Sequence, residues 1–209
     1  MKILITAGPT REPIDPVRFI SNRSSGKMGY AVANAAIESG HEVVLVSGPV
    51  SLPVPAGAVF IKVTTAEEMY QAVQDQIDWY DVLIMTAAVA DRRPAKASKN
   101  KIKKDRMESF IELTPTADIL YAVRDQKKDR LHIGFAAETD NIIEEARRKL
   151  VKKRLDLIVA NDVTRPDSGF ETDTNKVTFI TRSGLPLELP VMSKHEVAVN
   201  ILEWIEENA

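Results

Sequence analysis

The stretch that decides the fold is KILITA at residues 2–7, a short apolar run that ends at Gly8-Pro9. A β-branched run of this length, closed by residues that break regular structure, predicts a buried strand. Three prolines in residues 8–21 then exclude a helix from that segment. A helical pattern follows over residues 25–39 and is closed by a glycine, as C-terminal caps often are. The N-terminus therefore predicts a strand, a long loop and a helix.

The alternation of strands and helices continues along most of the chain. Further strands are predicted at residues 42–47, 59–63, 81–86, 109–113, 131–137 and 156–160. Further helices are predicted to begin at Thr65, whose capping box is completed by Glu68, at Asp118, at Asp140 and at Ser193. Residues 87–100 read as a loop, and residues 176–189 as a hairpin around Arg182-Ser183-Gly184.

These elements predict one α/β domain over residues 1–209. Strands that are continuously apolar are covered on both faces, which is typical of parallel sheets. We therefore expect a Rossmann-like, doubly wound, mostly parallel sheet with helices on both faces and a C-terminal β-hairpin extension. Such sheets bind ligands outside the carboxyl ends of their strands, so the loops that follow the strands matter most.

Composition excludes several classes of protein. The 209 residues are 44% hydrophobic and 28% charged, with a formal net charge of −2, so no global basic field favours nucleic acid. The absence of cysteine excludes disulfides and thiolate chemistry, and the three histidines match no zinc-site spacing. No apolar run is long enough for a membrane span or a signal peptide. The expectation is a soluble cytoplasmic protein.

The first candidate site is SNRSSGKMG at residues 21–29, which leads into the first helix. Small residues, two hydroxyls, Lys27 and a helix N-terminus would suit a phosphate or carboxylate. The Walker spacing is not met, and neither is the dinucleotide pattern G-x-G-x-x-G after the first strand. An N-capped helix after a flexible loop explains the same residues.

The other candidates also allow two interpretations. Asp91 could accept hydrogen bonds from a ligand or cap a turn, and Asn161 could bind ligand or turn the chain. Phe135 could stack on a base or belong to the core. Lys149 and Lys153 share a helix face that the helix dipole alone would explain. A basic stretch suits a polyphosphate or is a solvated charge run: Lys96, Lys99, Lys101, Lys103, Lys104 and Arg106.

Taken together and in order, these motifs resemble phosphopantothenoylcysteine synthetase. The resemblance covers essentially the whole chain. It is carried by TAGPTREPIDPVR at residues 6–18, SNRSSGKMG at 21–29, AAVAD at 87–91, KIKK at 101–104, GFAAE at 134–138 and ANDV at 160–163. The resemblance implies an enzyme that in many bacteria is the C-terminal half of a bifunctional coenzyme A biosynthesis protein, whose other half is a flavin-dependent decarboxylase.

The resemblance implies a ligase that joins 4′-phosphopantothenate to L-cysteine. It implies CTP as co-substrate, Mg²⁺ or another divalent cation, an acyl-cytidylate intermediate, and CMP and pyrophosphate as products. It also implies a homodimer, for which residues 176–189 are our guess at part of the interface. The partners expected are these substrates and a phosphopantothenoylcysteine decarboxylase domain or protein, with no nucleic acid, no membrane and no flavin in this chain. The metal ligands stay unknown.

The resemblance also implies roles for particular residues. Asn22 would act on the acyl-cytidylate, and Lys101, on a mobile flap, would serve the triphosphate. The implied nucleotide-binding residues are Asp91, Ala117, Asp118, Ile119, Leu120, Phe135, Lys149 and Lys153. The implied substrate-binding residues are Arg18, Ser24, Ser25, Gly26, Ala87 and Ala88. The chain has PTAD at residues 115–118 where relatives often place Asn-Pro before Asp-Ile, which leaves that loop's contacts open.

Two other functions remain as alternatives. A nicotinamide-dependent reductase could use the same fold, although Ser47 stands where an acidic ribose ligand would be expected. A non-catalytic nucleotide-binding protein would bind CTP without releasing pyrophosphate.

Overall fold

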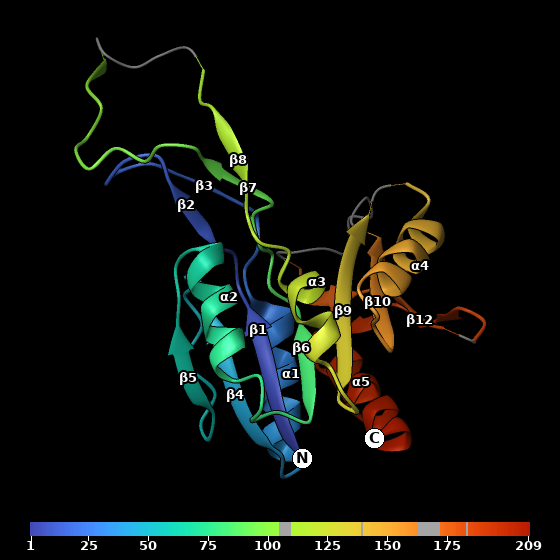
Figure 1. Ribbon diagram of the computed structural model, residues 1–209. Coiled ribbons are helices and arrows are strands. Elements are labelled where there is room, and N and C mark those ends of the chain that lie inside the picture. The colour runs from blue at the N-terminus through green and yellow to red at the C-terminus, as the bar shows by residue number, and fades with distance from the viewer. Residues whose placement is uncertain (105–109, 139, 163–171, 183) are drawn as a thin grey trace.

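The computed structural model describes residues 1–104, 110–138, 140–162, 172–182 and 184–209. Arg106, Ser109, Val163 and Ser183, which the sequence predictions include, lie outside these ranges. In the described part of the chain, eight strands form one twisted sheet (Figure 1). Their order across the sheet is β13-β12-β10-β9-β6-β1-β4-β5. Their bounds are β1 Lys2–Ala7, β4 Glu42–Ser47, β5 Val59–Lys62, β6 Val82–Met85, β9 Leu131–Glu138, β10 Leu157–Asp162, β12 Val177–Thr181 and β13 Leu187–Glu188.

The sheet is parallel from β5 to β10, and only β12 and β13 run antiparallel to their neighbours. From β1 the chain winds outward through β4 to β5, and then returns to pair β6 with β1 on the other side. The winding therefore reverses between β1 and β6, which is where doubly wound sheets bind ligands. The predicted fold class, including the C-terminal hairpin β12–β13, is confirmed.

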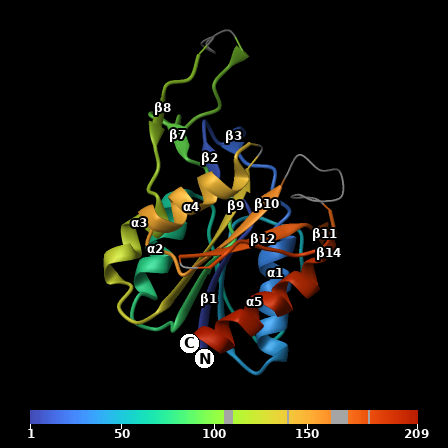
Figure 2. The ribbon, with the colours of Figure 1, turned by 90° about the vertical axis from the view of Figure 1, so that its right-hand side faces the viewer.

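Helices cover both faces of the sheet (Figure 2). Helices α1 (Lys27–Glu38) and α5 (Lys194–Asn208) pack side by side on one face. On the other face lie α2 (Ala66–Asp75), α3 (Ile119–Val123, followed by a 3₁₀ turn) and α4 (Ile142–Lys152). The apolar strand residues alternate between two buried clusters. Ile3 and Ile5 pack beneath α1 and α5, whereas Leu4 and Leu83 pack beneath α2 to α4.

Local signals set most helix ends. The Thr65–Glu68 capping box is present at the start of α2, as predicted. Gly40, which follows α1, has a φ of +78°. The start of α4 was predicted wrongly, because the helix begins at Ile142 after Asn141 in the left-handed conformation, and Asp140 is not its N-cap.

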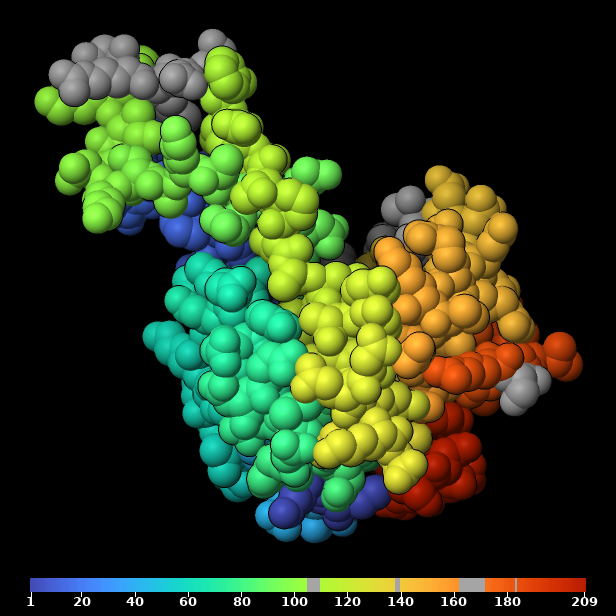
Figure 3. All heavy atoms as spheres, viewed as in Figure 1, coloured from blue at the N-terminus to red at the C-terminus, as the bar shows by residue number. Residues whose placement is uncertain are grey.

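An arm of four short strands extends from the body (Figures 1 and 3). It consists of the hairpin β2 (Arg11–Pro13) and β3 (Phe19–Ser21), of β7 (Arg92–Pro94) paired with β8 (Leu113–Pro115), and of the described residues that connect the two strands of each pair. Two predictions are corrected here. Residues 87–100 are not all loop, because β7 lies within them, and the strand placed at 109–113 begins only at Leu113. A separate two-stranded ladder joins β11 (Thr174–Asn175) to β14 (Met192–Ser193).

No helix in the described ranges is both long enough and apolar enough to span a bilayer.

Candidate functional site

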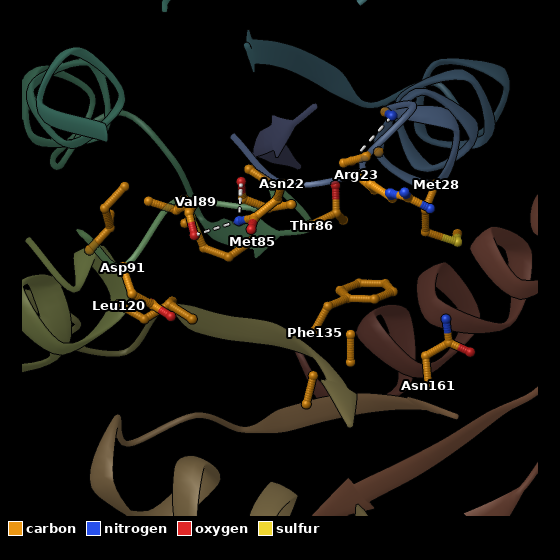
Figure 4. A pocket seen from close by; sticks show the side chains of 18 of the residues that line it. Asn22, Arg23, Met28, Met85, Thr86, Val89, Asp91, Leu120, Phe135 and Asn161 are labelled. Atoms are coloured by element: carbon orange, nitrogen blue, oxygen red, sulfur yellow. Dashed lines mark hydrogen bonds between the residues drawn. The ribbon is translucent and has the colours of Figure 1, made fainter. Parts of the chain in front are cut away.

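A cavity of about 370 Å³ opens at the carboxyl ends of the strands, where the winding reverses (Figure 4). The loop between β1 and α1 forms one wall, and the loop after β6 forms the next. Phe135 and Ala136 of β9, Asn161 of β10 and the start of α3 also line it, together with Lys153, Asn175 and Lys194. The predicted site residues on this lining are Asn22, Ser24, Gly26, Ala87, Ala88, Asp91, Ala117, Asp118, Ile119, Leu120, Phe135 and Lys153.

Asn22 joins the first two walls. Its Nδ2 donates to the main-chain oxygens of Ala88 and Val89, both at 3.1 Å. The main-chain N–H of Ala88 in turn donates to the oxygen of Gly8 at 2.9 Å. With both amide hydrogens directed at main-chain carbonyls, the side chain is held in one orientation, and Oδ1 is the atom through which it can accept a hydrogen bond.

Gly26 and Gly29 allow helix α1 to begin at the cavity. Gly26 is the N-cap and has a φ of +79°, a conformation that favours glycine, and its N–H donates to Ser24 Oγ at 3.3 Å. A Cβ on Gly29 would lie 2.6 Å from the Cβ of Ala7 and 2.4 Å from Thr86 Oγ1, so only glycine lets the helix pack this closely. The first N–H groups of α1 are thereby placed at the cavity, where they can bind an anion.

The opposite wall combines a short helix with an aromatic ring. Asp118 caps α3 by accepting the N–H of Tyr121 at 3.3 Å, and its Oδ1 pairs with Lys153 Nζ at 2.9 Å. The ring of Phe135 projects into the cavity below Thr86 (Figure 4). This wall offers a flat apolar surface beside a carboxylate and a lysine, a combination that suits a base and its sugar.

Four predicted site residues lie outside the described cavity lining. Ser25 and Lys149 come from elements that border it, and Ser25 Oγ accepts the N–H of Lys27 at 3.5 Å. Arg18 and Lys101 belong to the arm. Arg18 is bound to Asp15 and to the main-chain oxygen of Ile102, the neighbour of Lys101. The structure therefore does not bring Lys101 to Asn22 within this cavity.

Six polar residues on the lining received no role from the family resemblance: Arg23, Lys27, Thr86, Asn161, Asn175 and Lys194. Lys27 was considered as part of an anion site in the SNRSSGKMG motif, but the resemblance gave it no role. Asn175 and Lys194 lie far along the chain and are 3% and 6% exposed. The signal for Lys194 is its place in the first turn of α5, where the helix dipole disfavours a positive charge.

Charge at the site is dominated by lysines. Burial, followed by the nearby charge of Lys27, lowers the pKa of Lys194 to about 8. On the arm, the Arg18 guanidinium holds the pKa of Asp15 well below its usual range. In the described ranges, no three carboxylate or histidine side chains converge as a metal-binding group.

A doubly wound sheet with a cavity of this kind at its reversal point defines an α/β protein of the class whose ligand sites lie at the strand ends, and the donors that line this cavity suit phosphate. Within this class, the chain belongs to the family of the DNA/pantothenate metabolism flavoprotein C-terminal domain, whose sequence model matches residues 1–208.

Curated relatives of this chain are named coenzyme A biosynthesis bifunctional protein CoaBC. The chain is 51% identical over 204 residues to the protein from Bacillus subtilis, covering 97% of this chain and 50% of that protein. It is 49% identical over 195 residues to the protein from Escherichia coli strain K12, covering 90% and 48%. The chain thus spans about half the length of the curated relatives it matches.

Solved structures give the same family. The crystal structure of the C-terminal domain of CoaBC has a TM-score of 0.84 and 46% identity, covering 99% of this chain and 94% of that one. A Cab2 variant in complex with phosphopantothenate-cysteine shares the fold, with a TM-score of 0.80 and 17% identity over 99% and 86% of the two chains. The family resemblance inferred from the sequence motifs is confirmed.

Proposed function

We propose that this chain is a phosphopantothenate–cysteine ligase that acts in coenzyme A biosynthesis and consumes CTP. The observation that carries the proposal is the cavity at the reversal point, because four of the six motifs that suggested the synthetase contribute residues to its lining. Asn22, Gly26, Asp91, Phe135 and Lys153 all line it, although they come from four separate segments. Two proteins named for coenzyme A biosynthesis are 51% and 49% identical to this chain over almost its whole length, which supports the same activity.

The first step would activate the acid. The carboxylate oxygen of 4′-phosphopantothenate attacks the α-phosphorus of CTP, the bond from that phosphorus to the bridging oxygen breaks, and pyrophosphate leaves. The N–H groups at the start of α1 and the lysines of the cavity would stabilise the charge that develops on the phosphates. Phe135 would stack on the cytosine, and Asp118 with Lys153 would contact the nucleoside.

The second step would form the amide. The amine of L-cysteine attacks the acyl carbon of the acyl-cytidylate, loses a proton and displaces CMP. Asn22 is bound through Nδ2 to the loop after β6, and its Oδ1 would accept a hydrogen bond from the incoming amine. Ala87 and Ala88, which carry only methyl groups, would leave room for the pantothenate chain. No protein nucleophile is needed in either step.

The divalent cation would enter as part of the substrate. The described side chains form no resident group of metal ligands, and magnesium commonly binds proteins through substrate phosphates and one or two carboxylates. Mg-CTP is therefore the form of the nucleotide that we propose for the reaction.

We propose that the arm is the mobile flap and that the protein is a homodimer. Lys101 lies on the arm, so flap closure or a second subunit would have to bring it to the triphosphate. Large apolar side chains are exposed at two places that a partner could cover. The arm exposes Phe19, Phe110 and Ile111, and the hairpin β12–β13 exposes Leu185 and Leu187.

We further propose that a phosphopantothenoylcysteine decarboxylase, as a domain or a separate partner, uses the product, since the curated relatives are bifunctional and about twice as long. This chain itself would carry no flavin, and a flavin absorbance band in the purified protein would contradict that. A cytoplasmic location is proposed because the reaction consumes an intracellular nucleotide.

Pyrophosphate release tests the proposal. It should appear with CTP in the presence of phosphopantothenate and Mg²⁺, more slowly with ATP, GTP or UTP, and amide product should need cysteine as well. CTP binding without pyrophosphate release would favour the non-catalytic alternative. Ser47, at the end of β4, argues against the reductase alternative. It is not acidic, its side chain is buried, and its Oγ accepts a hydrogen bond from the Tyr30 hydroxyl at 3.3 Å.

A further inference from the structure

Thr10 joins the two loops that form the first two walls of the cavity. It lies in the loop after β1 and is fully buried, with 0% of its surface exposed. Its main-chain N–H donates to the oxygen of Ala88 at 3.3 Å, and its Oγ1 accepts the N–H of Ala90 at 3.0 Å. Thr10 is not on the described lining of the cavity, so it can act on a bound substrate only through residues that are.

The same residue also holds the chain beside Asn22. The main-chain oxygen of Thr10 accepts the hydroxyl of Ser21 at 2.7 Å, and Ser21 directly precedes Asn22. The pairing of β2 with β3 places Ser21 opposite Arg11, the residue that follows Thr10. The backbone that carries Asn22 is therefore fastened to Thr10, in addition to the contacts that Asn22 makes through its own side chain.

Both sets of contacts meet at one main-chain oxygen. The oxygen of Ala88 accepts the N–H of Thr10 and also Nδ2 of Asn22. Nδ2 makes its other hydrogen bond to the oxygen of Val89 (Figure 4). A carbonyl oxygen has two lone pairs, so the two donors share the oxygen of Ala88 without excluding each other. The position of this peptide sets where Nδ2 is held, and thereby where Oδ1 of Asn22 points.

The hydroxyl of Thr10 keeps the loop after β6 in this position. Ala90 is only 5% exposed, and a main-chain N–H buried without an acceptor is costly. On its other side, the oxygen of Ala90 accepts the hydroxyl of Thr116 at 2.5 Å. The main chain at Ala90 is thus held between two threonine hydroxyls. Removing the one at Thr10 leaves an N–H that only a shift of this loop can satisfy, and Asn22 is bound to the same loop.

We propose that Thr10 is a positioning residue for amide formation, which sets the peptides that hold Asn22 and so directs its Oδ1 at the incoming amine of cysteine. The inference rests on the proposed function and adds to it a residue outside the cavity that the motifs gave no role. Thr10 contacts no substrate. Its loss should therefore affect the second step, where Asn22 acts, more than the binding of CTP.

Thr10→Val tests this assignment, because valine keeps the shape of the side chain and removes the hydroxyl. The kcat for amide formation should fall about tenfold and the acyl-cytidylate should accumulate, while the KM for CTP changes by less than about threefold. Thr10→Ser, which keeps the hydroxyl, should recover most of the rate. Thr65→Val is the matched control, since it loses a hydroxyl that accepts the N–H of Glu68 at 3.2 Å. It should lower thermal stability and leave kcat and the level of intermediate unchanged.

A double variant separates positioning from a general loss of stability. Added to Asn22→Ala, Thr10→Val should lower kcat by less than about twofold more, because the side chain that it positions is already absent. A further tenfold loss, or parent-like kinetics of Thr10→Val alone, would overturn the inference. Ser21→Ala, at an exposed position, removes the other contact to Thr10 and should give the same pattern with a smaller loss. It provides the test if Thr10→Val does not fold.

Nuclear magnetic resonance of the Asn22 side-chain amide makes the inference independent of the ligase activity. The two Nδ2 proton signals of the free protein, assigned by their loss in Asn22→Ala, should move towards the positions of a free amide in Thr10→Val and stay in place in Thr10→Ser. If they do so while the parent chain forms no amide product, the positioning contact stands and the proposed function fails. Unmoved signals in Thr10→Val, in a chain whose parent is an active ligase, would overturn the positioning role alone.

Discussion

Asp15 and Arg18 are joined by two side-chain hydrogen bonds, from Arg18 Nε at 3.1 Å and from Nη2 at 2.5 Å, both to Asp15 Oδ2. The same Oδ2 accepts the main-chain N–H of Ile102 at 3.1 Å, and Arg18 Nη2 donates to the oxygen of Ile102 at 3.0 Å. This pair therefore fixes the backbone beside Lys101 to the loop between β2 and β3. Asp15 is 3% exposed, and the Arg18 guanidinium holds the pKa of the Asp15 carboxyl well below its usual range. The carboxylate is therefore ionised throughout the working pH range.

Asp15→Asn tests whether this pair positions the arm. An amide carries no charge and cannot form an ion pair with the guanidinium, so the segment that carries Lys101 should loosen. We expect kcat/KM of the ligase to fall about tenfold or more, and trypsin to cut faster within the lysine-rich residues 99–104. Asp129→Asn, at an exposed turn, is the matched control. Parent-like proteolysis together with parent-like kinetics would show that Asp15 does not position the arm.

Variants of Asn22 and Lys101 should block different steps of the ligase reaction. If Lys101 serves activation and Asn22 serves aminolysis, Lys101→Ala should form little acyl-cytidylate, whereas Asn22→Ala should form it and let it accumulate. Mass spectrometry of quenched reactions with CTP, phosphopantothenate and cysteine measures the intermediate directly. Equal levels of the intermediate in the two variants would show that this division of roles is wrong.

Phe135 should contribute to nucleotide affinity through its ring. Base–aromatic stacking is worth roughly 1–3 kcal/mol, so Phe135→Leu should raise the KM for CTP about tenfold while Phe135→Tyr leaves it nearly unchanged. Phe60→Leu, on the edge strand β5, controls for the general loss of an aromatic residue. If Phe135→Leu lowered thermal stability without raising the KM, the ring would be a core residue and not a stacking surface.

The two exposed apolar surfaces can be separated by their effect on the oligomeric state. Phe110 on the arm is 72% exposed and Leu185 in the hairpin region is 91% exposed. A glutamate in the centre of a dimer interface would be buried without a partner and should raise the dissociation constant at least tenfold. Light scattering across a dilution series of Phe110→Glu and Leu185→Glu identifies the surface. A dimer that neither variant weakens would exclude both surfaces.

The sequence was sufficient for the elements whose signals are local. The apolar runs of β1 and β4, the capping box at Thr65 and the glycine after α1 each depend on residues within one or two turns of chain. From these the winding of the sheet follows, and with it the place of the cavity. The motif residues at the strand ends could therefore be predicted to share one site.

The arm could not be predicted because its strands break the local rules. Pro13, Pro94 and Pro115 lie in β2, β7 and β8, and proline within a run argues against a strand unless that strand is at an edge. Pairing of β7 with β8 is also non-local, across more than 18 residues. Lys194 was missed for a related reason, since its burial depends on α1 and residues 172–175, which no local pattern connects to α5.

His132 should make the protein acid-sensitive independently of its active site. The ring is fully buried in β9, its Nε2 lies 3.0 Å from the hydroxyl of Tyr80, and its Nδ1 has no partner among the described residues. Burial, together with the charges of Lys127 and Arg130, lowers its pKa to about 3. The unfolded chain binds a proton near pH 6.5, whereas the native state does not, so stability should fall as the pH falls from about 6.5 towards 3.

His132→Gln keeps an acceptor for Tyr80 but cannot titrate, so it should flatten this dependence. Urea unfolding at about pH 7.5 and about pH 5 should show the parent protein losing about 1–2 kcal/mol more than the variant, because each pH unit below the unfolded pKa costs about 1.4 kcal/mol. The variant should be the less stable of the two at the higher pH, since glutamine fills the site less well. His195→Gln, at an exposed position on α5, should leave the dependence unchanged. The same loss in the parent and in His132→Gln would place the acid-sensitive group elsewhere in the chain.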